Sequence, residues 1–119
     1  MGVRIPIVFA ALLAATSASA QDLTLMCSGE ALDWSITLDG QNAEMNIGFL
    51  SDLEVMATTI AEGADWPRAL TLLGNQDTAI LILDQIPEAS DEDATHTAQV
   101  LTQRGQTPIL LTGTCVPLR

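Results

Sequence analysis

Apolar and polar residues alternate along much of the chain, a period of two that is typical of β-strands with one buried face. The clearest example is Ala31–Asp39 (A-L-D-W-S-I-T-L-D), in which apolar residues alternate with polar ones from Leu32 onward. The pair Asp39-Gly40 follows with the composition of a tight turn, and the alternation resumes over Asn42–Gly48. These residues therefore predict a β-hairpin.

A second hairpin is predicted near the C-terminal end, over Thr95–Cys115. Thr, Val, Leu and Ile are frequent on both sides of Gly105, as half-buried strands favour, and this glycine permits the tight reversal between them. On the second strand, Cys115 falls on the same face as Ile109 and Leu111. The cysteine is therefore expected to point toward the apolar side of the sheet.

The segments between the two hairpins also have the composition of strands. Leu53–Ile60 fits either a strand or a short helix, and the β-branched residues at its end favour a strand. Ala79–Leu83 is apolar at every position, which predicts a central strand covered on both faces. Further strands are expected over Asp22–Ser28, Arg68–Leu73 and Asp77–Asp84, the last two joined around Gly74-Asn75.

Together these segments give about eight short strands and no clear helix, which predicts an all-β fold. A small antiparallel barrel and a sandwich both fit this pattern. A bond between Cys27 and Cys115 would bring the first and last strands together and close a barrel, which removes exposed sheet edges. We therefore expect residues 21–119 to form a single barrel or sandwich domain.

The segment Met1–Ala20 predicts a cleaved secretory signal peptide. Arg4 is its single charged residue, an apolar run follows over Ile5–Ala15, and Ala18-Ser19-Ala20 matches an A-x-A cleavage site. The apolar run is shorter than the roughly 20 residues that a membrane-spanning helix needs. We expect an exported domain, periplasmic or secreted, that begins at Gln21 and has no membrane span; an uncleaved anchor is the alternative.

Two cysteines remain after this cleavage, Cys27 and Cys115. Export places them in an oxidising compartment, where small domains often carry disulfides because their cores are limited. A Cys27–Cys115 disulfide is therefore predicted. Two free buried thiols are the alternative, and the lack of a C-x-x-C spacing disfavours a redox-active pair.

The chain is strongly acidic. It has 4 Lys+Arg against 15 Asp+Glu, a formal net charge of −11 that becomes −12 when Arg4 leaves with the signal, and it contains no lysine. Nucleic acids and anionic lipid surfaces are therefore not expected partners, because both require positive charge on the protein. A basic partner or a cation is compatible with this charge, although acidity can also serve solubility alone.

The sequence contains no recognisable catalytic constellation. His96 is the single histidine, and no serine or cysteine nucleophile has a recognisable setting beside it, so a histidine of the barrel wall is expected rather than an enzyme. The carboxylates of Glu88, Asp91, Glu92 and Asp93 lack the spacing of a calcium-binding loop, which leaves a solvated acidic loop or a weak calcium site. We expect no cofactor.

Two tryptophans have different sequence settings. Trp34 lies in a strand with regular alternation and is expected to fill the barrel interior. Trp66 lies between Asp65 and Pro67 in an irregular segment, where an aromatic side chain can anchor a protein interface or close the mouth of a barrel. Trp66 and the acidic loop Glu88–Asp93 are therefore the candidate contacts with a partner.

Two stretches resemble a family of small exported bacterial proteins of uncharacterised function. They are C-S-G-E-A-L-D-W-S-I-T-L-D-G (Cys27–Gly40), which includes an early W-S-[LI]-T strand, and V-L-T-Q-R-G-Q-T-P-I-L-L-T-G-T-C (Val100–Cys115). The family often ends this last strand with two adjacent cysteines, where this chain has Gly113-Thr114-Cys115. A partner for the second cysteine is also missing near Gln85–Pro87.

The family in turn is similar, more loosely, to small β-barrel inhibitors of c-type lysozyme. This chain has no lysine, so it lacks a counterpart of the inhibitors' aromatic-lysine loop. The resemblance implies a non-enzymatic binding or inhibitory module of the cell envelope. The negative charge of this chain would attract a basic envelope or extracellular protein, of which a c-type lysozyme is one example. A barrel that holds a small apolar ligand is the alternative function.

Overall fold

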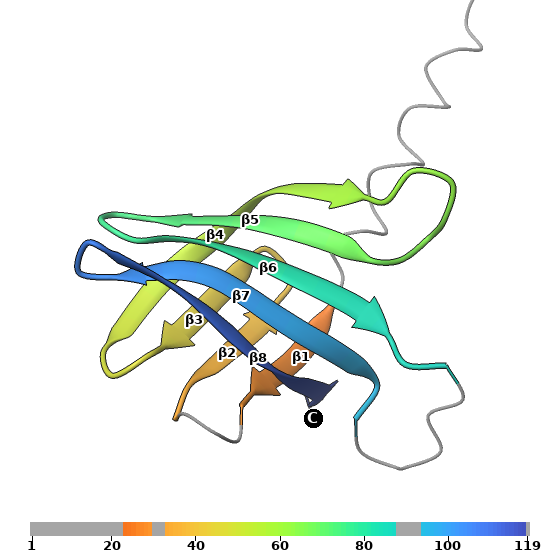
Figure 1. The fold of residues 1–119 in the computed structure, drawn as a ribbon, viewed down its shortest axis with the longest axis horizontal. Coiled ribbons are helices and arrows are strands. Elements are labelled where there is room, and N and C mark those ends of the chain that lie inside the picture. The colour runs from red at the N-terminus through yellow and green to blue at the C-terminus, as the bar shows by residue number, and fades with distance from the viewer. Residues whose placement is uncertain (1–22, 30–32, 88–93, 119) are drawn as a thin grey trace, which may run out of the picture.

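The computed structural model of the protein describes residues 23–29, 33–87 and 94–118. Within this part of the chain, eight antiparallel strands each pair with the next, and the last strand returns to pair with the first (Figure 1). The sheet therefore closes into a barrel. The strands are β1 (Thr24–Ser28), β2 (Ser35–Asp39), β3 (Asn42–Asn46), β4 (Leu50–Ile60), β5 (Arg68–Gly74), β6 (Thr78–Gln85), β7 (His96–Arg104) and β8 (Thr107–Pro117).

The predicted all-β fold is confirmed, and of the two architectures the barrel is the one observed. Both hairpin turns use the glycine that marked them: Gly40 and Gly105 have φ of 67°, in the left-handed region that favours glycine. The ambiguous segment Leu53–Ile60 belongs to β4, where a β-bulge between Val55 and Ala57 shifts the register against β5.

Some predictions concern residues outside the described part of the chain. These are the signal peptide with its cleavage site, Met1–Ala20, and the whole acidic loop, Glu88–Asp93. Within the described residues, no helix has the length and apolar character that crossing a membrane requires.

The barrel interior is filled by side chains that point inward at every second position of the strands. Trp34 is 4% exposed and belongs to this core, as its place in the alternation predicted. Burial of such apolar surface contributes roughly 25 cal/mol per Å² and is the main force that holds the strands together. The largest fully buried residues are Ile36, Leu38, Met45, Leu72, Leu81, Leu83, Val100, Cys27 and Cys115.

The prediction that Ala79–Leu83 is covered on both faces was wrong. Ala79, Leu81 and Leu83 point into the barrel and are buried, but Ile80 lies on the outer surface and is 38% exposed. The reason is the closed architecture, in which every strand has one face inside and one outside. Apolar residues on both faces of β6 therefore indicate an apolar patch on the outer surface.

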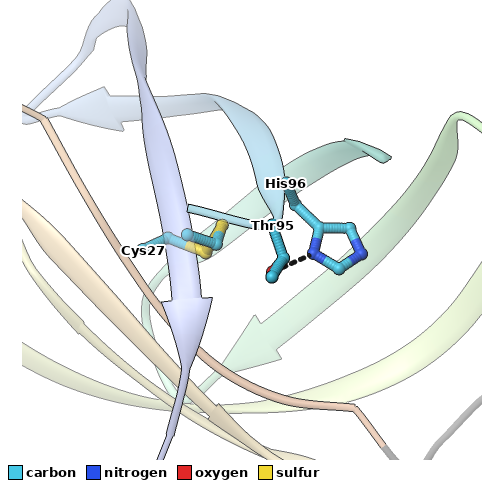
Figure 2. Close-up of a disulfide and its surroundings, with 4 residues drawn as sticks. Cys27, Thr95 and His96 are labelled. Atoms are coloured by element: carbon cyan, nitrogen blue, oxygen red, sulfur yellow. Dashed lines mark hydrogen bonds between the residues drawn. A yellow bond between two sulfur atoms is a disulfide. The ribbon is translucent and has the colours of Figure 1, made fainter. Parts of the chain in front are cut away.

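The barrel closes between β1 and β8. Cys27 and Cys115 are directly opposite each other in this strand pair, and the predicted disulfide joins them (Figure 2). Their Cα atoms are 3.9 Å apart and both residues are completely buried. The covalent bond therefore lies inside the barrel, at the seam where its first and last strands meet.

Two glycines bring the backbone of this seam close to Trp34. A Cβ atom on Gly113 would overlap the carbonyl oxygen of Ser28 and would lie 2.8 Å from Cζ2 of Trp34. A Cβ atom on Gly29 would overlap the indole Nε1 of Trp34 and would lie 2.7 Å from the carbonyl oxygen of Thr112. The seam thus depends on the absence of side chains at these two positions.

We predict that Gly113→Ala lowers the free energy of unfolding by roughly 1–3 kcal/mol, the usual cost of overpacking, because β1 or Trp34 must move to admit the methyl group. Thr112→Ala is the matched control, since Thr112 points outward, and it should change stability by less than about 0.5 kcal/mol. Urea unfolding followed by tryptophan fluorescence measures both variants. Equal stability of Gly113→Ala and the wild type would contradict the tight seam.

We predict that the double variant Cys27→Ala/Cys115→Ala loses about 4–5 kcal/mol of stability, because the disulfide joins residues separated by 88 positions and restricts the unfolded chain. Guanidinium unfolding of the oxidised protein, the reduced protein and the variant provides the measurement. The reduced wild type controls for the lost sulfur atoms. If all three unfold at the same midpoint, the disulfide contributes nothing to stability.

Candidate functional site

Trp66, Arg68 and His96 meet at one end of the barrel, and we call them the mouth cluster. The guanidinium carbon of Arg68 lies 4.2 Å from the centroid of the Trp66 ring, a cation–π contact. The ring centroids of Trp66 and His96 are 4.8 Å apart, with their planes inclined by 56°. His96 is opposite Cys115 in the strand register, so the mouth cluster adjoins the disulfide.

The loop between β4 and β5 brings Trp66 to this position. The backbone N–H of Ala61 donates to the carbonyl oxygen of Pro67 at 3.0 Å, which draws the two ends of the loop together. Arg68 Nε donates to the carbonyl oxygen of Asp65 at 2.9 Å, which orients its guanidinium group. Trp66 is half-buried and packs against the hydrophobic core. The indole therefore covers part of the barrel end while some of its surface stays accessible.

His96 is inside the barrel wall and is 7% exposed. Its Nδ1 shares a hydrogen bond of 2.8 Å with the hydroxyl group of Thr95, as Figure 2 shows. Its Nε2 is buried and has no hydrogen-bond partner. Leaving such an atom unpaired costs about 1–3 kcal/mol, which the packing of the mouth cluster has to offset.

Burial is the largest influence on the charge of His96. It lowers the pKa of the imidazole below its usual value of 6.5, and the positive charge of Arg68 lowers it further. The carboxylate of Asp84 acts in the opposite direction but does not reverse the shift. The imidazole is therefore neutral at neutral pH, which suits a side chain packed against an indole ring and near a guanidinium group.

The mouth cluster has the contacts of a packed plug. The Nε2 atom of His96 is buried, so a substrate has no access to it, and both cysteines are bonded to each other. In the described part of the chain, no group of three or more His, Cys, Asp or Glu is placed to hold a metal ion. The chemistry that the cluster offers is packing and the part of the Trp66 surface that stays accessible.

The outer surface of the barrel is divided by charge. Outward positions on β2, β3 and the first half of β4 carry the carboxylates of Asp39, Glu44, Asp52 and Glu54, which we call the acidic face. On β5–β8, which are described throughout, Asp84 is the single charged residue at an outward position. The negative charge of the described strands is thus concentrated on one side of the barrel.

Like charges are placed side by side on the acidic face. Glu44 and Asp52 are directly opposite each other in the β3–β4 pair, and both are exposed. Asp39 and Glu54 flank Asn42 in a neighbouring row across the same strands. Like charges directly opposite in a sheet destabilise it by up to about 1 kcal/mol per pair. A positively charged partner would relieve this repulsion.

The candidate contacts proposed from the sequence have different outcomes. Trp66 lies in the mouth cluster, whereas Glu88, Asp91, Glu92 and Asp93 lie outside the described residues. The acidic face was missed because each of its carboxylates occupies an ordinary polar position in an alternating strand. The signal was nevertheless present, since the outward residues of the second predicted hairpin, within Thr95–Cys115, include no carboxylate.

Comparison with known proteins identified no relative. A scan of protein-family models gave no match, and searches of curated proteins and of solved structures gave none either.

We predict that His96 makes stability depend on pH. Because its folded-state pKa is below the unfolded value of 6.5, the unfolded chain takes up the proton first. Stability should be constant above about pH 7.5, should fall as the pH drops through about 6.5, and should level off below the folded-state pKa. His96→Gln should abolish this step. Thermal melts across the range measure it, and an imidazole NMR titration with a pKa above 6.5 would contradict it.

Proposed function

We propose that the protein is an exported, non-enzymatic β-barrel that binds, and thereby inhibits or sequesters, a basic protein of the envelope or the extracellular space. The acidic face is the primary contact. The observation that carries this proposal is the placement of Asp39, Glu44, Asp52 and Glu54 on neighbouring strands, with Glu44 opposite Asp52. A partner's lysine or arginine side chains would replace repulsion between these carboxylates by attraction.

Three further features support a binding role. The interior is occupied by buried side chains, so the outer surface is the part of the barrel that is free to interact. The disulfide at the seam makes the barrel a stable support for that surface. The accessible part of Trp66 offers a second contact region at the mouth. In the sequence that follows β6, Glu88, Asp91, Glu92 and Asp93 add further negative charge.

The family resemblance suggests which partners to test first. Of the two stretches that resemble small exported barrels, Cys27–Gly40 and Val100–Cys115, the described residues include parts of β1, β2, β7 and β8, which are the two strands of the seam and their neighbours. The looser similarity to inhibitors of c-type lysozyme makes such a lysozyme the first candidate. Since the chain has no lysine, inhibition would use carboxylates rather than an aromatic-lysine loop.

A small apolar ligand is the second candidate function, and it has less support. The positions that would line an internal cavity are taken by residues such as Leu38, Leu72 and Leu81, which are completely buried. Such a ligand would have to displace core side chains at a cost of several kcal/mol. Native mass spectrometry of protein purified from its own compartment tests this function, and a bound small molecule would favour it over a protein partner.

Retention of partners from an envelope extract on the immobilised protein tests the proposed function. A basic protein should be retained at low salt and released at high salt, because the association is electrostatic. The double variant Glu44→Gln/Asp52→Asn should retain much less of it. The charge-matched control Glu62→Gln/Asp84→Asn removes the same net charge near the mouth, the second contact region, and should retain clearly more than the acidic-face variant.

Two results would contradict the proposal. One is the absence of any retained basic protein at low salt. The other is an equal loss of retained protein in both double variants, because retention would then depend on net charge alone. Trp66→Ala is a separate arm for the second contact region. If it alone abolishes retention while circular dichroism shows a folded barrel, the partner contacts the mouth cluster rather than the acidic face.

A further inference from the structure

The outer surface of β5–β8 is nearly free of charge. Its outward positions carry Thr, Gln, Leu, Ile, Ala, Pro and Val, with Asp84 at the mouth end as the exception. Four neighbouring strands without an outward lysine, arginine or glutamate are unexpected in a chain of formal net charge −11. We call this surface the neutral face.

Apolar side chains form a continuous row across the neutral face. Ile80 on β6, Leu101 on β7 and Leu110 on β8 are successive partners in the register and are 38%, 47% and 60% exposed. Leu73 on β5, 40% exposed, lies diagonally next to Ile80. Cross-strand neighbours of this kind touch each other, so these residues make one apolar ridge. Contiguous apolar surface on an exported domain typically marks an interaction site.

The neutral face is hollowed beside this ridge. The next outward pair of residues on β7 and β8 is Gln99 and Thr112. This pair lies about 7 Å from Leu101 and Leu110, in the direction of the disulfide. From there a shallow hollow of about 700 Å³ extends toward the mouth. Its lining includes Ile82, Thr97, Gln99, Thr112, Thr114 and, at the mouth end, the carboxylate of Asp84.

We propose that the neutral face binds the neutral face of a second copy of this chain, with the ridge of each copy seated in the hollow of the other. A two-fold dimer requires a surface that carries both complementary shapes, and ridge and hollow lie side by side on this one. The apolar side chains of Leu101 and Leu110 would leave water and contact Ile82 and the methyl groups of the threonines.

Charge identifies a second copy as the occupant. Two molecules that each carry a strongly negative charge repel each other wherever carboxylates face carboxylates, and the acidic face is such a surface. The neutral face limits this repulsion to one carboxylate per copy, that of Asp84, which lines the mouth end of the hollow. β3 is four strands from β7 in either direction around the barrel, so dimerisation through β6–β8 leaves both acidic faces turned outward. The dimer does not depend on the proposed partner, but it would present two binding faces.

Sedimentation velocity over about 1 to 200 μM tests the dimer. The wild type should shift from monomer to dimer across this range. Leu101→Glu and Leu110→Glu should each raise the dissociation constant by at least about tenfold, because a carboxylate would be buried against apolar groups. Met56→Glu is the matched control: Met56 is an apolar residue on β4, 57% exposed and outside the neutral face, so the variant should dimerise like the wild type.

Each variant is checked by circular dichroism and thermal melting, so that loss of the dimer is not confused with loss of the fold. A wild type that is monomeric at every concentration would overturn the proposal. So would a dimer that survives both leucine substitutions, or one that Met56→Glu disrupts equally. Capture of another envelope protein by a monomeric wild type, abolished by Leu101→Glu, would assign the neutral face to a different partner.

Salt separates this proposal from the proposed function. Screening weakens the residual repulsion between two acidic copies, so salt should strengthen the dimer while it releases a basic partner. If a monomeric protein retains a basic partner that salt releases, the proposed function is supported and the proposed dimer is contradicted. A dimer strengthened by salt, without any retained partner, would support the dimer and contradict the proposed function.

Discussion

Closure of the barrel between β1 and β8 is the constraint on which the rest of the structure depends. An open eight-stranded sheet would expose two edges and half of an apolar face, and a small chain has little other surface with which to cover them. The seam is held by backbone pairing, by the Cys27–Cys115 disulfide and by close approach at Gly29 and Gly113. Once it is closed, every strand has a buried face and a solvent face.

Closure also decides where charge can be placed. Because the inner face is filled mainly by apolar side chains, most polar residues point outward, and the chain distributes them unevenly around the barrel. Carboxylates occupy the side of β2–β4, while β5–β8 carry threonine, glutamine and apolar residues outward, with Asp84 as their single carboxylate. The cylindrical arrangement sets these two surfaces on opposite sides. One protein can thereby carry an electrostatic contact surface and an apolar one without mutual interference.

The mouth cluster shows how side chains can cover the end of such a barrel. Trp66 supplies apolar area, and Arg68 makes a cation–π contact with its ring. His96 lies beneath with one buried nitrogen unpaired, next to the disulfide. A neutral imidazole is compatible with this arrangement, whereas a charged one would face Arg68 in a poorly solvated position. The plug is therefore coupled to pH through a single residue.

The sequence by itself determined the strands, the turns and the disulfide, because these follow from local alternation, from glycine conformations and from the number of cysteines. It indicated Trp34 as a core residue for the same reason. It did not determine which outward residues become neighbours, since the pairing of Glu44 with Asp52, or of Leu101 with Leu110, depends on strand register. It also suggested two covered faces for Ala79–Leu83, whereas barrel closure left Ile80 exposed. The candidate surfaces were decided by tertiary structure, because adjacency across strands is set only when the sheet closes.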